Sequence, residues 1–189
     1  MCFLAEVYLL EAVRDVLRDE LTLTANQCDC EPYEVFPQTA GDEYVAVIPA
    51  SMEIGPTQNT SGGVFDVMHA FTVSVMHRVG DVPRDRRRTV FLNHLAGLGK
   101  RLDDVVALLN WKINACGLAT NRLQADFPGS EKFTELPRVT RMDTCNRNLP
   151  QEAIGAKSSP NMGATPVLVQ ARAVTFGRCR RITTIGSIS

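Results

Sequence analysis

A run of alternating side chains from Val64 to Val79 constrains the fold more than any other feature of the sequence. Its odd positions carry apolar side chains and two histidines, His69 and His77, whereas several even positions carry charged or hydroxyl side chains. A period of two predicts a β-strand with one apolar face. Strands usually have about 5 to 6 residues, so a strand of this length needs neighbouring strands and a layer that covers its apolar face. We expect both histidines to be buried or at the edge of the core, without a catalytic role.

Two amphipathic helices are expected to form the covering layer. Apolar side chains recur every three or four residues within residues 3–21 and again from Phe91 to Leu109, and this spacing places them on one face of a helix. The second helix should reach about Asn110. Gly97 and Gly99 lie inside it, where they cost helix stability and predict close packing against the sheet or a neighbour.

Three further segments are expected to join the long strand in a sheet. Their patterns predict strands at residues 43–49, 138–147 and 165–182. The last segment alternates through Ala171 and Ala173 and then slips to Val174, which predicts a β-bulge.

The order of these elements predicts an α+β domain. We expect an antiparallel sheet of about four strands, including two long ones, with the two amphipathic helices packed on one face. A single domain should span residues 1–189, with a long irregular insertion at about 117–164, where prolines and polar residues replace any regular period. The exposed edge of so long a strand invites pairing, so we also expect the protein to assemble with other subunits.

Charge, cysteines and motifs argue against several classes of function. The chain has 20 Lys and Arg residues against 21 Asp and Glu residues, unlike a dedicated nucleic-acid binder. Its first residues lack the basic region of a signal peptide, and Glu6 interrupts the apolar run too early for a membrane span. The six cysteines are scattered, and Cys28 and Cys30 have no second pair or histidine cluster to complete a metal site. No catalytic motif is present, so we expect neither enzyme activity nor a cofactor or metal.

The sequence RDRRR, residues 84–88, concentrates positive charge at the start of the second helix. Positive charge at this end opposes the helix dipole. A solvated first helical turn is one interpretation, and an anionic partner is the other: the acidic surface of a neighbour, or DNA phosphate. The candidates for such a contact are Arg84, Arg86, Arg87 and Arg88.

Five stretches cover most of the chain outside residues 117–164: LAEVYLLEAVRDVLRDEL, YVAVIPASMEI, FDVMHAFTVSVMHRVGD, RRRTVFLNHLAGLGKRLDDVVALLN and PVLVQARAVTFGR. In their order and texture they resemble the tail terminator proteins of long-tailed bacteriophages, which are also called tail completion or head–tail joining proteins. The resemblance lies in the sequence of elements and not in a diagnostic motif.

This resemblance implies a small α+β subunit that forms a ring, typically a hexamer, on top of the tail tube. Such a ring stops polymerisation of the tail tube protein and presents a surface to a head-completion, stopper or connector protein, while DNA passes through its lumen. Its place would be the tail or neck of the virion, assembled in the host cytoplasm without a membrane. The four arginines would lie at an interface or face the lumen. Residues 117–164 would contact an outer structure such as the tail sheath, or lengthen the ring wall.

Two other functions fit the same sequence. A head-completion or stopper protein of the neck would share the ring arrangement but bind filled heads instead of isolated tails. A small nucleic-acid-binding module could use RDRRR and the sheet face. Against that module, the chain has only three Tyr and one Trp, and its long strand lacks the aromatic pairs on which bases stack.

Overall fold

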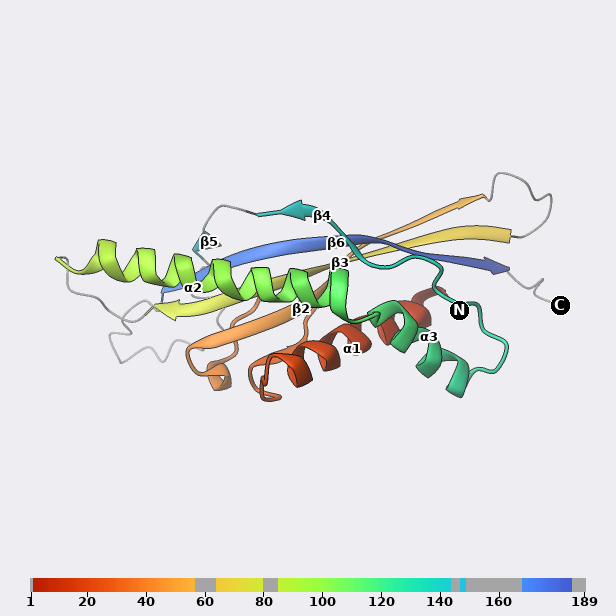
Figure 1. Ribbon diagram of the computed structural model, residues 1–189, viewed down its shortest axis with the longest axis horizontal. Helices are drawn as coiled ribbons and strands as arrows, with labels where there is room; N and C mark the ends of the chain where they lie inside the picture. The colour runs from red at the N-terminus through yellow and green to blue at the C-terminus, as the bar shows by residue number, and fades with distance from the viewer. Residues whose placement is uncertain (1, 57–63, 80–84, 144–146, 149–167, 185–189) are drawn as a thin grey trace, which may run out of the picture.

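The computed structural model describes residues 2–56, 64–79, 85–143, 147–148 and 168–184 (Figure 1). Within these residues the chain is an α+β protein, as predicted. The helical elements are α1 (Cys2–Glu20), the short η1 (Gln38–Ala40), α2 (Arg87–Ala107), the π-helical segment η2 (Leu108–Lys112) and α3 (Ala115–Asp126). The strands are β1 (Cys28–Cys30), β2 (Glu43–Pro56), β3 (Val64–Val79), β4 (Arg138–Met142), β5 (Arg147–Asn148) and β6 (Leu168–Thr184).

The described strands form one six-stranded sheet in the order β1-β2-β3-β6-β4, with β5 also paired to β6. The prediction of an antiparallel sheet of about four strands is therefore confirmed in part: the sheet is mainly antiparallel, but it has six strands and one parallel pair. β1 runs parallel to β2, with Cys28 opposite Val45, whereas the other pairs are antiparallel. A strand of three residues is too short to show a period of two, which is why the sequence pattern did not reveal it.

β2 continues beyond Pro49, where the sequence predicted its end. The register between β2 and β3 shifts between Pro49 and Ser51, so a bulge carries the strand past the proline. β1 pairs with β2 only as far as Val47. Pro49 pairs with Phe71 of β3 on one side, but on the side of β1 it has no strand partner among the described residues, and a proline is tolerated at such an uncovered edge.

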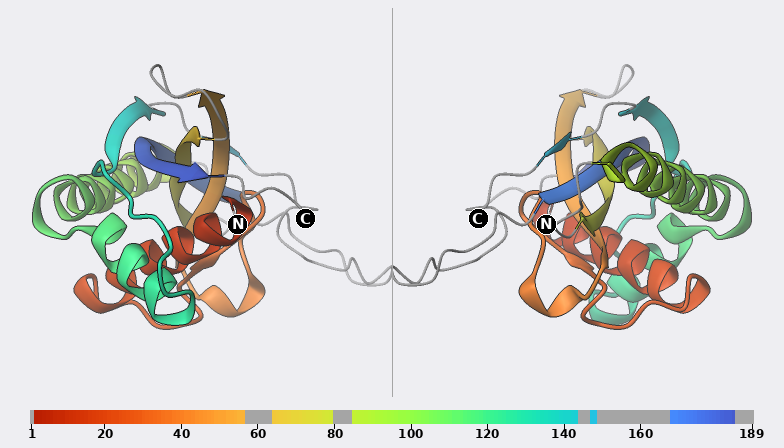
Figure 2. Two further views of the ribbon diagram at one scale, coloured as in Figure 1. Left: turned by 90° about the vertical axis from the view of Figure 1, so that its right-hand side faces the viewer. Right: turned by 90° about the vertical axis from the view of Figure 1, so that its left-hand side faces the viewer.

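Helices α1 and α2 lie on one face of the sheet, as predicted (Figure 2). They enclose a core in which Phe71 of β3 stacks on Phe176 of β6, with ring centroids 5.2 Å apart and both residues fully buried. Gly97 and Gly99 permit the close approach of α2 that their positions predicted. A Cβ at Gly97 would lie 3.1 Å from His77 Cε1, and one at Gly99 would lie 3.1 Å from Arg172 Nη1.

A third helix, α3, begins the segment that was predicted to be an irregular insertion, and that prediction was wrong for residues 117–126. The Asn114 side chain caps α3 by accepting a hydrogen bond from Gly117 N at 2.8 Å. The residues that α3 buries are mostly small, so its hydrophobic pattern is weak: Ala115, Cys116, Ala119, Thr120 and Leu123. β4 confirms the strand expected from Arg138, whereas residues 144–146 and 149–167 lie outside the described residues.

The slip in the pattern of β6 was interpreted as a bulge after Ala173, and this was wrong. Ala173 and Val174 pair in continuous register with Ser74 and Val73 of β3. Apolar residues occur on both faces here because a second, smaller core covers the other face; its members are Phe36, Ala40, Tyr44, Ala46, Ile48, Met76, Val169 and Ala171. The bulge lies further along, between Phe176 and Cys179, where Arg178 has a φ of 63°.

The molecule is elongated, and different elements project at its two ends (Figure 1). At one end the paired ends of β2, β3 and β6 reach past the helices, and at the other end the start of α2 reaches past the sheet. No helix in the described ranges has both the length and the apolar character needed to cross a membrane.

Candidate functional site

An open groove of about 680 Å³ lies between α2 and the adjoining ends of β2 and β3. On the side of the sheet, the lining residues are Glu43 of β2, His77 of β3 and Asp42, which directly precedes β2. One face of α2 contributes the rest of the lining: Val90, Asn93, His94, Gly97, Lys100, Arg101 and Asp104. The groove thus combines apolar surface with charges of both signs.

A chain of four side chains ties α2 to the sheet in this groove. Arg101 donates from Nε and Nη2 to the two carboxylate oxygens of Glu43, at 2.8 and 2.9 Å. Glu43 Oε1 lies 3.5 Å from His77 Nε2, and His77 Nδ1 lies 3.4 Å from His94 Nδ1. The sequence did not predict that any two histidines would meet. In the fold the rings of His77 and His94 lie edge to face, with ring centroids 5.5 Å apart.

Glu43 is the electrostatic centre of this chain. Burial by itself would raise the pKa of its carboxyl, but the hydrogen bonds from His77 and Arg101 outweigh burial and lower the pKa to about 2. The pKa of His94 is lowered because burial disfavours its charged form, and the charge of His77 lowers it further. Glu43 is therefore ionised across the neutral range and acts as a fixed anion that holds two elements together.

Replacing Glu43 with Gln should lower the free energy of unfolding by about 1–2 kcal/mol at pH 7, since its partners are partly exposed and screened. Because folding lowers this pKa from 4.5 to about 2, the wild-type advantage is complete above pH 4.5 and disappears as the pH falls towards 2. Urea denaturation of both proteins at several pH values measures the difference. Glu53→Gln, at an exposed position of the same strand, should show little change at any pH. A difference that stays constant down to pH 2.5 would contradict the assignment.

The other end of the core contains a buried polar pair, His69 and Arg181, each 1% exposed. Arg181 Nη1 lies 3.3 Å from Glu131 Oε2, and the ring of Phe133 meets His69 edge to face at 5.6 Å. Neither ring nitrogen of His69 has a hydrogen-bond partner among the described residues. The prediction that His69 is a buried histidine is confirmed.

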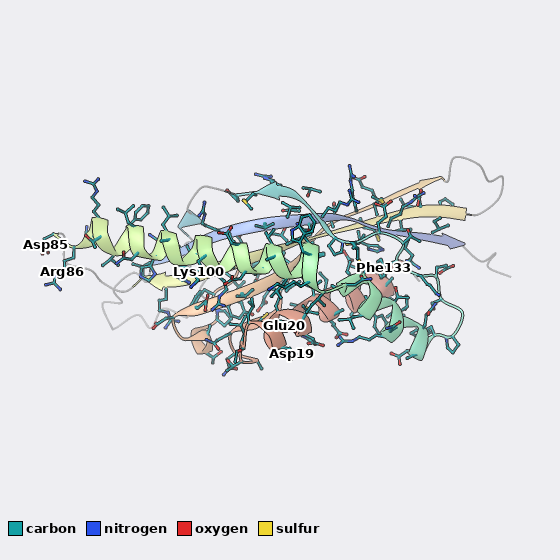
Figure 3. The ribbon with its side chains drawn as sticks, in the orientation of Figure 1. Asp19, Glu20, Asp85, Arg86, Lys100 and Phe133 are labelled. Atoms are coloured by element: carbon teal, nitrogen blue, oxygen red, sulfur yellow. The ribbon has the colours of Figure 1, made fainter. Side chains whose placement is uncertain are left out.

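Three of the four candidate arginines lie at the projecting start of α2 and are exposed: Arg86, Arg87 and Arg88. Arg86 is the N-cap residue, and its side chain makes no capping hydrogen bond. Figure 3 shows Asp85 and Arg86 at the tip of the helix, well away from Lys100 and the body of the molecule. Arg84 lies outside the described residues. A role for these arginines at an interface stays a prediction.

Sequence reasoning missed Trp111, the only tryptophan of the chain. It lies on η2 and is 83% exposed, the largest value among the exposed large apolar residues that the structure describes. A signal was available in the sequence. Trp111 follows Leu109 by two residues and so falls off the helical stripe of three- and four-residue spacings.

The groove presents the cation of Lys100, the carboxylates of Asp42 and Asp104 and the apolar surface of Val90 and Gly97. In the part of the chain that the structure describes, no group of three or more His, Cys, Asp or Glu side chains is arranged to hold a metal ion. The chain matches no known protein-family model, and a comparison with curated proteins finds no significant match.

Proposed function

We propose that the protein is a structural component of a bacteriophage virion: a tail terminator that forms a ring, expected to be hexameric, at the head-proximal end of the tail tube. The ring ends polymerisation of the tube and joins the tail to the neck. This proposal rests on the resemblance in the order of elements and on the shape of the subunit.

The observation that carries the proposal is the elongated form with different projections at its two ends (Figure 1). A ring is built from heterologous contacts, in which one surface of a subunit binds a different surface of the next. A subunit therefore needs two unlike surfaces that lie apart. The strand ends of β2, β3 and β6 and the start of α2 meet this requirement.

The outer edge of β2 gives independent support for assembly. β1 covers only Val45 to Val47, so the edge from Ile48 to Pro56 has no strand partner among the described residues. Ile54 is 51% exposed on this segment. An uncovered strand edge is a liability in a monomer, and a neighbouring subunit would cover it.

In this proposal one face of the ring binds the tail tube protein, and the other binds a head-completion, stopper or connector protein. DNA passes through the lumen without sequence-specific contact, and a tail sheath is a further partner where the tail has one. Specificity comes from matched shape and charge, and the absence of a tube-like surface on the head-proximal face prevents further stacking.

Adding the purified protein to growing tail tubes tests the proposal. We expect electron micrographs to show a ring at one end of each tube, tubes that stop growing, and a ring-sized mass by light scattering. Filled heads are the control. Binding to heads with no effect on tubes would instead identify a head-completion or stopper protein. Salt-sensitive retention of nucleic acid on a filter, with neither effect, would favour the nucleic-acid-binding module.

Changing Arg84, Arg86, Arg87 and Arg88 together to Ser should leave the monomer folded but impair ring assembly. The three described members are exposed at the start of α2, so their replacement opens no cavity in the core. The loss of charge contacts should raise the concentration needed for assembly on the order of tenfold. Light scattering measures assembly, and circular dichroism measures folding. Arg138→Ser with Arg141→Ser, at exposed positions of β4, is the control. Unimpaired assembly of the fourfold variant would remove the arginines from the interface.

A further inference from the structure

Trp111 is the most exposed large apolar side chain in the described part of the molecule, at 83%. It stands on η2, directly after α2, and Lys112 follows it in the same segment. A tryptophan at this exposure still has most of its large apolar area available for burial against a partner. Tryptophan is enriched among the few residues that carry most of the energy of protein interfaces, because it buries a large area and donates one hydrogen bond.

The groove beside His77 has the chemistry to receive an indole ring. Its volume of about 680 Å³ exceeds that of one indole, and Val90 and Gly97 supply apolar surface. Lys100 can lie over the face of the ring as a cation. Asp42 and Asp104 can accept the hydrogen bond that the indole N–H donates. Glu43 already accepts hydrogen bonds from Arg101 on both of its oxygens, so the two aspartates are the acceptors that we assign to the indole.

Trp111 does not line the groove of its own chain, and it is 83% exposed. The lining that α2 contributes ends at Asp104, and Trp111 follows seven residues later, about 10 Å further along at the rise of an α-helix. The side chain and the groove are thus two separate, complementary surfaces of one molecule. Such a pair produces a head-to-tail contact between copies, which closes into a ring or continues as a filament.

We propose that Trp111 of one copy seats in the groove between α2 and the β2–β3 ends of the next copy. The inference rests on the proposed function in one respect: repetition of this contact is what closes the ring. To the proposed ring it adds the two surfaces in contact, Trp111 and the groove, which the order of elements in the sequence does not specify.

The single tryptophan makes the contact directly measurable. As the protein concentration rises, light scattering should show an increasing mass. Over the same concentration range the tryptophan emission should shift to shorter wavelength, and the tryptophan should become protected from acrylamide quenching. Trp111→Ala should weaken association on the order of 30-fold or more, as expected for an interface anchor. Tyr33→Ala is the matched control, since Tyr33 is an exposed aromatic residue, at 63%, outside the groove. It should associate as the wild type does.

A mixing experiment tests the head-to-tail geometry. The double variant Asn93→Phe and Lys100→Glu fills the groove, removes its cation and leaves Trp111 in place. At a concentration just sufficient for the wild type to assemble, each variant alone should stay monomeric, because each lacks one half of the contact. Mixed together, Trp111→Ala and the groove variant should form a one-to-one dimer that grows no further, with the tryptophan of the groove variant buried. A wild-type mass that stops at a dimer would overturn the head-to-tail arrangement.

The tail-tube assay separates this inference from the proposed function. If Trp111→Ala still forms rings on tubes, the anchor is wrong and the terminator proposal stands. If the wild type associates with its tryptophan buried but ignores tubes, the contact stands and the terminator proposal fails. A wild type whose tryptophan remains accessible to acrylamide in every assembled form would overturn the inference.

Discussion

Phe71→Ala should lower the free energy of unfolding by about 3–5 kcal/mol, the largest effect that we expect from a single substitution. Phe71 is fully buried and lies at the centre of the core, where its ring stacks on Phe176 at 5.2 Å with an interplanar angle of 16°. Removing the ring loses its burial and leaves a cavity between the sheet and the helices. Urea denaturation followed by circular dichroism measures the change.

Phe91→Ala provides the matched control, since it removes the same side chain from a different environment. Phe91 continues the apolar stripe of α2 but is 39% exposed, on the half of the helix that reaches past the sheet. We expect this variant to lose less than about 1 kcal/mol. Equal losses for the two phenylalanines would mean that the start of α2 packs into the core, and would remove one of the two projections on which the ring proposal depends.

Acidification should destabilise the protein through His69 before it affects any paired carboxylate. Burial, and then the charge of Arg181, lower the pKa of His69 from 6.5 to about 4. Folding therefore favours the neutral imidazole, and stability is highest above pH 6.5. As the pH falls from 6.5 towards 4 the unfolded chain binds a proton that the folded protein excludes, so stability should fall by up to about 3 kcal/mol.

His69→Leu should remove this dependence. At pH 8 it should be nearly neutral or slightly stabilising, since neither ring nitrogen has a partner among the described residues. At pH 4.5 it should be clearly more stable than the wild type. His94→Leu is the control, because His94 is only partly buried and most of the slope should remain. If His69→Leu retained the full slope between pH 6.5 and 4, another group would be the one that titrates.

Local periodicity was sufficient for the main elements of the fold. β3 spans Val64 to Val79 as the alternation predicted, and α1 and α2 follow their apolar stripes closely. Each of these patterns is long and repeats the same spacing of apolar residues many times, so one polar residue at an apolar position does not obscure it. The shorter or weaker elements escaped notice: β1 has too few residues for a period, and α3 buries mainly small side chains.

The candidate site was predicted less completely. The basic start of α2 is exposed, as a charged helix end would be. The groove could not have been anticipated, because Glu43, His77 and His94 come from three different elements, and His77 and His94 alone are 17 residues apart. Their meeting depends on the register of β2 against β3, where Glu43 lies opposite His77, and on the close approach of α2 at Gly97.

The sequence by itself determined the α+β class, the long central strand and the two helices that cover one face, because these follow from which side chains avoid water along a local repeat. Only the tertiary structure decided the parallel pairing of β1, the bulge at Arg178 and the chain from Arg101 to His94. Each of these depends on which distant segment becomes the neighbour. That choice follows from the packing of the whole core, and no local pattern of residues encodes it.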